Sequence, residues 1–175
     1  MAVLGFAGWS GAGKTTLLTA VLPGLVGRGL RVSTIKHAHH DFDIDRPGKD
    51  SFRHREAGAS EVLIGSGRRF ALMHEYRDEA EAGLDALLAR LSPVDLVLVE
   101  GFKYEPIPKI EVWRAASGKP MLQPEDPRII AVAGDRPVAG LPVPWLDAGA
   151  PETVVAFIAD WLDGLAAGKR RGAAE

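Results

Sequence analysis

The chain of 175 residues contains no cysteine. This absence excludes disulfide bonds and thiolate metal sites, and it is typical of proteins in a reducing compartment. The sequence also carries a net charge of only −2, which indicates no general affinity for nucleic acid or anionic membranes. It has no apolar run long enough to span a bilayer, and its apolar N-terminus lacks the basic residues of a signal peptide. We therefore expect a cytoplasmic protein that binds neither nucleic acid nor membrane.

Apolar residues make up 46% of the chain and charged residues 25%, the balance of a soluble globular protein. A chain of this length can bury a sizeable core within one domain. Because we find no internal repeat and no linker-like stretch, we predict a single domain over residues 1–167. The small and charged residues of 168–175 predict a disordered tail.

The strongest functional signal is a glycine-rich stretch near the N-terminus, Gly8 to Thr15, which reads G-x-x-x-x-G-K-T. A short apolar run, Val3 to Ala7, precedes it and predicts a buried strand. Behind it, apolar residues recur at helical spacing, so a helix is expected to begin near Lys14. A strand, this loop and a helix form a phosphate-binding loop, which predicts a nucleoside triphosphate ligand. The residues predicted to bind the ligand are Gly8, Ser10, Gly11, Ala12, Gly13, Lys14, Thr15 and Thr16.

The residue types in this loop suit polyphosphate chemistry. Its glycines let backbone N–H groups converge on an anion beside the positive end of the helix dipole. Lys14 adds a mobile positive charge for the β- and γ-phosphates and is predicted to be catalytic, and the Thr15 hydroxyl is a predicted Mg²⁺ ligand. Glu100 follows the predicted buried strand 95–99, where it would face the loop and hold Mg²⁺ directly or through water. The alternative for Glu100 is a carboxylate that caps a turn.

Strand-like and helix-like segments alternate behind the loop, which predicts an α/β fold. We expect a P-loop NTPase-like wound, mostly parallel sheet with helices on both faces and an inserted β-hairpin. Pro23 is expected to kink or end the first helix, and Asp78 with Glu81 has the capping-box spacing for a helix through Leu91. The other expected elements are strands at 31–37, 109–114 and 129–133, a hairpin at 61–65 and 68–74, and a helix from about Pro151.

Recognition of the base is less clearly encoded. The Asn-Lys-x-Asp tetrad of many guanine-specific P-loop proteins is absent from the sequence. Asp135 follows the late strand 129–133, where a lone carboxylate could accept hydrogen bonds from the guanine ring. The alternative is an aspartate that initiates a turn before Pro137.

The segment Lys36 to Asp45 is dense in histidine and aspartate. Without cysteine or helical histidine spacing, a switch-like loop near the γ-phosphate is favoured over a transition-metal site. In that segment's continuation, Asp50 is predicted to be catalytic by positioning water or magnesium. A plain helix N-cap is the equal alternative for Asp50.

Several motifs together resemble one family, the MobB family of adaptor proteins in molybdopterin-guanine dinucleotide biosynthesis. The resemblance rests on Gly8 to Thr16, on the stretch IKHxHHDxDxDxPGKDS from Ile35 to Ser51, and on REAGA and VLVEGFK. It covers nearly all of the chain up to about Asp135. It implies a homodimer that binds GTP, hydrolyses it weakly, and helps a guanylyltransferase attach GMP to molybdopterin. Relatives with a deviant loop carry an extra lysine after the first glycine, but here Trp9 stands there.

Two functions from different classes fit the loop. The first is a GTP-binding adaptor with GTP and Mg²⁺ as ligands, and with a molybdopterin guanylyltransferase, molybdopterin and a second copy of the chain as partners. The second is a free-standing small-molecule kinase, which would need an arginine-bearing lid and an acceptor pocket. Arginines at 53, 55, 68 and 69 could furnish a lid, but no acceptor site is legible in the sequence. The apolar residues of the hairpin 61–74 independently favour pairing with another chain.

Overall fold

The computed structural model describes residues 1–38 and 42–172, with side chains described through Gly168. The described chain forms two compact units, one of residues 1–37 and 88–175 and the other of residues 38–87. The assignment of residues 1–167 to one domain stays a prediction.

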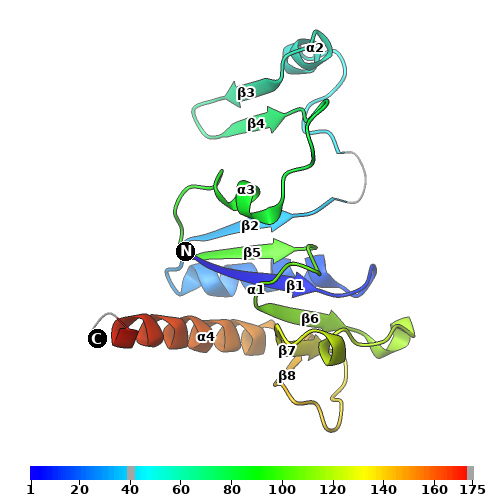
Figure 1. The fold of residues 1–175 in the computed structure, drawn as a ribbon, viewed down its shortest axis with the longest axis vertical. Coiled ribbons are helices and arrows are strands. Elements are labelled where there is room, and N and C mark those ends of the chain that lie inside the picture. The colour runs from blue at the N-terminus through cyan, green and yellow to red at the C-terminus, as the bar shows by residue number, and fades with distance from the viewer. Residues whose placement is uncertain (39–41, 173–175) are drawn as a thin grey trace. The chain divides into compact units, whose positions relative to one another are not determined.

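The first unit is built on a six-stranded sheet in the order β2-β5-β1-β6-β7-β8. All five strand pairs in it are parallel, so their carboxyl ends meet at one edge (Figure 1). The strands are β1 (Ala2–Ala7), β2 (Val32–Lys36), β5 (Leu96–Glu100), β6 (Lys109–Trp113), β7 (Ile129–Gly134) and β8 (Trp145–Asp147). The predicted parallel α/β architecture is thereby confirmed. The positions of the five predicted strands, β1, β2, β5, β6 and β7, agree with the predicted ones to within one residue at either end, whereas β8 was not predicted. The strand order reverses at β1, which is where ligands bind in open parallel sheets.

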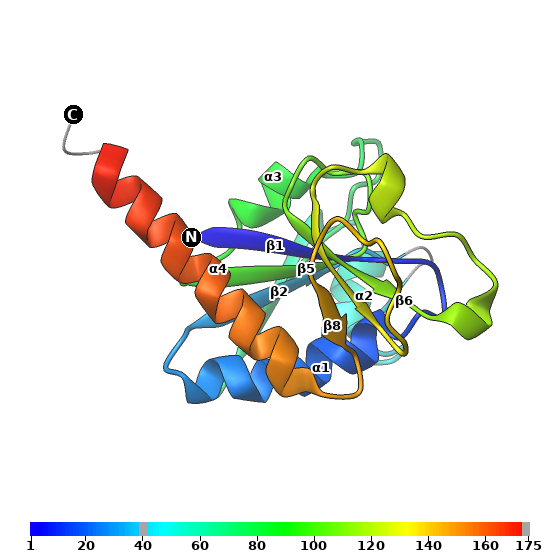
Figure 2. The same ribbon diagram turned by 90° about the horizontal axis from the view of Figure 1, so that it is seen from below.

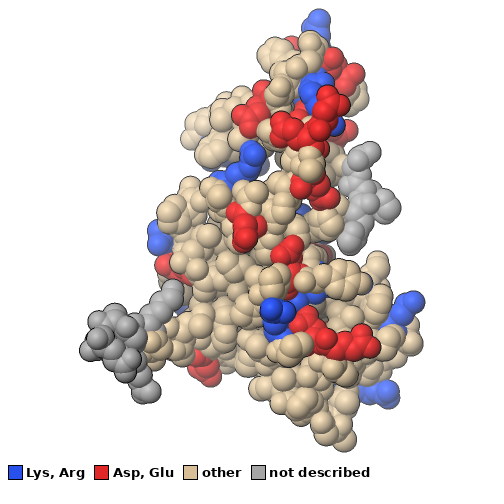
Figure 3. Space-filling model, viewed as in Figure 1, with Lys and Arg blue, Asp and Glu red and all other residues tan. Residues whose placement is uncertain are grey.

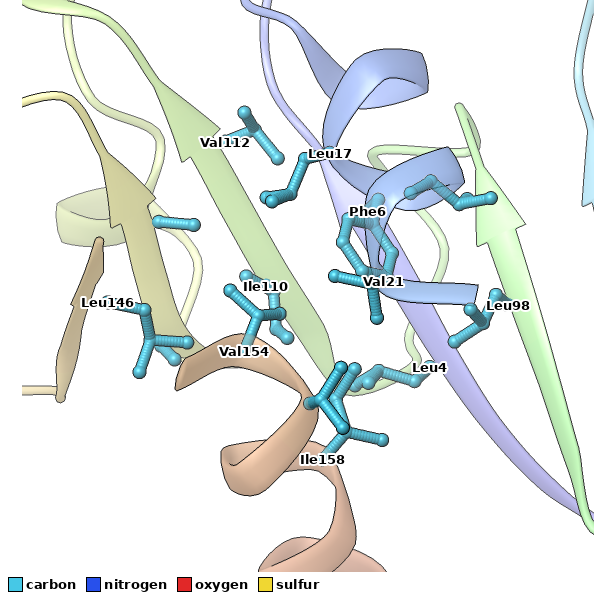
Figure 4. Packing of buried hydrophobic residues seen from close by; sticks show 14 of the residues in the cluster. Leu4, Phe6, Leu17, Val21, Leu98, Ile110, Val112, Leu146, Val154 and Ile158 are labelled. Carbon is cyan, nitrogen blue, oxygen red and sulfur yellow. The ribbon is translucent and has the colours of Figure 1, made fainter. Parts of the chain in front are cut away.

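The core of this unit lies between the sheet and two helices, α1 (Lys14–Gly27) and α4 (Pro151–Gly172). The two helices lie side by side on one face of the sheet (Figure 2). Phe6 from β1, Val21 from α1 and Ile158 from α4 are all fully buried in this core (Figure 4). Burial of this kind stabilises the strand-to-helix geometry from which the phosphate-binding loop projects.

Two helix predictions are corrected. Pro23 does not end α1, which continues to Gly27, because Val21 and Leu25 on either side of it are fully buried and their packing outweighs the missing N–H. At the other end of the chain, α4 continues to Gly172, so residues 168–172 are helical, whereas the prediction placed a disordered tail from 168. Residues 173–175 of that predicted tail lie outside the described residues.

The second unit contains α2 (Asp50–Glu56), the antiparallel hairpin of β3 (Glu61–Gly65) and β4 (Phe70–His74), and most of α3 (Leu84–Leu88). The inserted hairpin is therefore confirmed. The predicted capping box did not start a helix, because the segment at Arg77 turns tightly with a positive φ of 44° and the helix begins only at Leu84. Arg55 anchors this unit through ion pairs to Asp43 and Asp45, at 2.9 and 2.8 Å, and to Glu75.

Basic and acidic side chains are interspersed on the face of the molecule in Figure 3.

Across the described residues, no helix is both long enough and apolar enough to cross a bilayer.

Candidate functional site

The phosphate-binding loop joins β1 to α1 at the carboxyl edge of the sheet. Gly8, Gly11 and Gly13 have φ angles of 144°, 79° and 95°, a region that side-chain-bearing residues rarely adopt. A Cβ on Gly8 would also lie only 2.4 Å from the Val112 carbonyl oxygen, so that position requires glycine for space as well. The loop is closed by a hydrogen bond of 3.1 Å from the Ala12 N–H to the Trp9 carbonyl. These constraints explain the glycine spacing of the motif.

Lys14 is the first residue of α1, and its ammonium group lies inside the loop. It donates to the carbonyl oxygens of Gly8 and Trp9, at 2.9 and 3.0 Å. Burial lowers the pKa of Lys14 below its ordinary value of 10.5, Glu100 opposes that effect, and the charges of Lys103 and Lys36 add to it. The structure therefore concentrates positive charge where the sequence predicted a phosphate.

Glu100 ends β5 beside the loop, as predicted, and is almost fully buried. Its Oε1 accepts a 2.5 Å hydrogen bond from the Thr15 hydroxyl and lies 3.7 Å from the Lys36 ammonium nitrogen. The structure thus brings together the two predicted magnesium ligands. Both are oxygen donors, the kind of ligand that Mg²⁺ prefers, so the donor set fits this ion. Which of its two predicted roles Glu100 has, magnesium ligand or turn cap, stays a prediction.

The structure adds two cationic residues that the sequence analysis did not assign. The Lys103 ammonium nitrogen lies 4.2 Å from the centre of the Trp9 ring. The Arg114 guanidinium packs against Gly13. A Cβ added at Gly13 would lie only 3.0 Å from a guanidinium nitrogen of Arg114. Both follow strands that flank β1, so their position after strand carboxyl ends was the available signal. A cavity of about 60 Å³ adjoins the loop and is lined by Thr16, Leu17, Arg114 and Ala148 among others.

The other predicted binding residues are on or near the loop. Ser10 is exposed, and Ala12 is buried against the core. Asp135 is exposed directly after β7, and its Oδ1 accepts a hydrogen bond of 3.2 Å from the Ala115 N–H. This bond ties Asp135 to the segment that follows β6. Its predicted role in binding guanine stays a prediction.

Asp50 belongs to the second unit, where it is the first residue of α2. The N-cap position is Lys49 and no side-chain hydrogen bond caps the helix, so the alternative that Asp50 is the N-cap is wrong. Its predicted catalytic role stays a prediction. Part of the histidine- and aspartate-rich segment, residues 39–41, lies outside the described residues. Among the side chains that are described, no group of three or more His, Asp or Glu is arranged to hold a metal ion.

Residues 3–135 match the model of the MobB family, described as molybdopterin guanine dinucleotide synthesis protein B. The chain is 47% identical over 163 residues to the molybdopterin-guanine dinucleotide biosynthesis adapter protein of Escherichia coli (strain K12), covering 91% of this chain and 93% of that protein. It is 44% identical over 161 residues to the protein of the same name from Haemophilus influenzae, covering 91% and 89%.

Solved structures agree with the sequence comparisons. A crystal structure of molybdopterin-guanine biosynthesis protein B superposes with a TM-score of 0.72 at 30% identity, over 91% of this chain and 99% of that one. A MobB homologue from Bacillus stearothermophilus gives a TM-score of 0.70 at 25% identity, over 94% and 99%. The sequence match, the parallel sheet and the phosphate-binding loop at its switch point lead to one conclusion. The chain belongs to the MobB family.

Proposed function

We propose that this protein is a GTP-binding adaptor in the biosynthesis of the molybdopterin guanine dinucleotide cofactor. In this proposal it holds GTP with Mg²⁺ and assists a guanylyltransferase that attaches GMP to molybdopterin. Its own hydrolysis of GTP is weak.

One observation carries the nucleotide part of the proposal: Lys14 and the Thr15–Glu100 pair lie at the same phosphate-binding loop. An ammonium group already inside the loop can exchange its carbonyl acceptors for phosphate oxygens, which accept charge-assisted hydrogen bonds. The N–H groups at the start of α1 add donors and the positive end of the helix dipole. This combination favours a polyphosphate over a single carboxylate or an apolar ligand.

Thr15 and Glu100 would hold Mg²⁺. When bound, the ion neutralises charge on the β- and γ-phosphates. Glu100 is fixed for this task by its position at the end of a fully buried strand, and Lys36 balances its charge. The cavity beside Thr16 and Arg114 adjoins the loop on the side of β6, where we place the nucleoside. Asp135, which accepts a hydrogen bond from the Ala115 N–H after β6, is the residue that we propose for binding the base.

The adaptor part of the proposal is supported by the comparisons. The E. coli and H. influenzae proteins that carry the adapter name match more than nine-tenths of this chain. We therefore favour an output that is delivered through a partner enzyme.

A homodimer is part of the same proposal. Leu63, Leu72 and Phe70 share one face of the hairpin and are 64%, 43% and 73% exposed, whereas Val62 and Met73 on its other face are buried. Three large apolar side chains on one exposed strand surface favour association with a second copy of the chain.

Calorimetric titration with GTP and with ATP tests the nucleotide part. We expect GTP to bind more tightly than ATP, and Lys14→Ala to weaken GTP binding by about 10-fold or more because the main countercharge is lost. Lys119→Ala, at an exposed lysine in the segment after β6, is the matched control and should bind normally. Unchanged affinity in Lys14→Ala would show that the loop is not the site, and equal binding of GTP and ATP would overturn the guanine assignment.

A further inference from the structure

Lys103 contacts the loop residue that stands where some P-loop proteins have a second lysine. Its ammonium nitrogen lies 4.2 Å from the centre of the Trp9 ring and 4.9 Å from the centre of the Tyr104 ring. A cation over an indole ring is attracted by the negative face of the ring. The contact with the indole ring therefore stabilises the ammonium group of Lys103 in this position.

The backbone that carries Lys103 is fixed from two sides. The chain turns sharply after Glu100, with Gly101 and Phe102 at φ angles of 93° and 47°. Further along, the buried ammonium group of Lys109 donates to the carbonyl oxygen of Lys103 at 3.0 Å and forms an ion pair of 2.6 Å with Asp126. A side chain presented from such a constrained segment reaches the same place repeatedly, as a binding residue must.

Trp9 is itself held in place and lies between two ammonium groups. Its indole N–H donates to the Pro120 carbonyl at 2.8 Å, which fixes the ring under Lys103. Its own carbonyl accepts from Lys14 at 3.0 Å. Lys103 and Lys14 thus lie on the ring side and the backbone side of one loop residue, and their like charges repel. Bringing like charges together costs free energy that a bound anion offsets.

We propose that Lys103 is a phosphate-binding residue of the nucleotide site, and that Trp9 positions its ammonium group at the mouth of the loop. The charge that a second loop lysine would supply comes here from the segment after β5. This proposal rests on the proposed GTP binding. It predicts that Lys103 contributes more to the binding of GTP than of GDP, because GTP carries the additional terminal phosphate.

The test is calorimetric titration of Lys103→Met with GTP and GDP in the presence of Mg²⁺. We expect GTP affinity to fall about 10-fold, the loss of one charge-assisted hydrogen bond, and GDP affinity to fall less. Lys103→Arg keeps the charge and the contact with the ring, so it should retain most of the preference. Lys119→Met is the matched control, because Lys119 is exposed and its ammonium nitrogen lies farther from the centre of the Trp9 ring, at 5.8 Å.

A double variant separates a charge effect from a structural one. Trp9→Lys together with Lys103→Met moves the lysine into the loop and should restore the preference for GTP over GDP. If the wild-type protein prefers GTP over GDP and Lys103→Met keeps the same preference, the inference about Lys103 is wrong, while the proposal that the protein binds GTP still stands. Wild-type protein that binds neither nucleotide would overturn both. If Lys103→Met has a lowered unfolding midpoint, Lys103→Arg decides, since a large loss of GTP preference in that variant contradicts the proposal.

Discussion

The hydroxyl of Thr15, on the first turn of α1, donates a hydrogen bond of 2.5 Å to Glu100 at the end of β5. The two residues are 85 positions apart in the sequence, and parallel pairing of β1 with β5 brings their elements together. A hydroxyl and a carboxylate in contact beside a phosphate-binding loop form an oxygen-rich pair suited to Mg²⁺. The magnesium proposal therefore depends on this contact.

Glu100→Gln tests the magnesium proposal. Glutamine can still accept the hydrogen bond from Thr15, but it lacks the negative charge that attracts a divalent cation. We expect the Mg²⁺ concentration needed for half-maximal GTP binding to rise about 10-fold or more, which is the order of one charge–metal interaction. Asp163→Asn, at an exposed carboxylate on α4, removes the same charge elsewhere and should leave that concentration unchanged. A normal magnesium requirement in Glu100→Gln would exclude Glu100 as a ligand.

GTP binding should be linked to proton uptake at alkaline pH. The pKa of Lys14 lies below 10.5, chiefly because of burial, and a bound triphosphate would raise it again. Just above the lowered pKa of Lys14, the free protein has lost the ammonium proton that Lys14 retains in the complex with GTP. The affinity for GTP should therefore fall as the pH rises through that range. Calorimetry at several pH values across the alkaline range, in buffers of different ionisation enthalpy, measures the uptake. Binding without proton uptake throughout the alkaline range would contradict this account of Lys14.

The lowered pKa of Lys14 also makes the stability of the folded protein depend on pH. Between the lowered pKa and 10.5, the unfolded chain binds more protons at Lys14 than the folded chain does. The contribution of Lys14 to the free energy of unfolding therefore rises with pH in this window. Lys14→Met should lack that rise when the two proteins are compared by denaturant unfolding across the alkaline range.

The hairpin should govern assembly. Leu63→Glu places a charge beside its cross-strand partner Leu72, in the exposed apolar face, and a buried unpaired carboxylate at an interface is costly. We expect the wild-type protein to be dimeric by light scattering at micromolar concentrations, and Leu63→Glu to be monomeric with an unchanged circular dichroism spectrum. Leu165→Glu, at an exposed leucine on α4, is the matched control. A monomeric wild-type protein would end the homodimer proposal.

Hydrolysis of GTP by the isolated protein should be slow. Acceleration requires an oriented water as well as positive charge on the transferring phosphoryl group. Lys14, Lys103 and magnesium supply charge, but Asp50, the predicted water-positioning residue, would bring negative charge instead. We expect turnover well below about 1 s⁻¹, the low end of ordinary enzymes, in a phosphate-release assay. Turnover of tens per second would mean that the protein is an enzyme in its own right.

The sequence predicted most of the fold because its signals were local. The G-x-x-x-x-G-K-T motif defined the β1–α1 junction, and uninterrupted apolar runs such as Leu96 to Val99 indicated buried strands. The expectations that were wrong also rested on local rules: that Pro23 could end the first helix, and that Asp78 begins a helix. Packing of Val21 and Leu25 overrode the first, and a tight turn at Arg77 replaced the second.

The site was only partly predictable. Lys14, Thr15 and Glu100 follow from the motif and from the position of a carboxylate after a buried strand. Lys103 and Arg114 do not, because their importance depends on how loops from different strands fold over β1. The hydrogen bond from the Lys109 ammonium group to the Lys103 carbonyl is a tertiary contact that no sequence spacing predicts.

The proposed function requires that bound GTP gives this protein its effect on a partner enzyme. The most direct measurement is the amount of molybdopterin guanine dinucleotide formed by the guanylyltransferase from molybdopterin, GTP and Mg²⁺, at limiting GTP, with wild-type protein or Lys14→Ala. We predict that wild-type protein raises the yield, whereas Lys14→Ala leaves it at the level of the guanylyltransferase alone. Equal stimulation by the two proteins would contradict the account, because the effect would then not depend on the phosphate-binding loop.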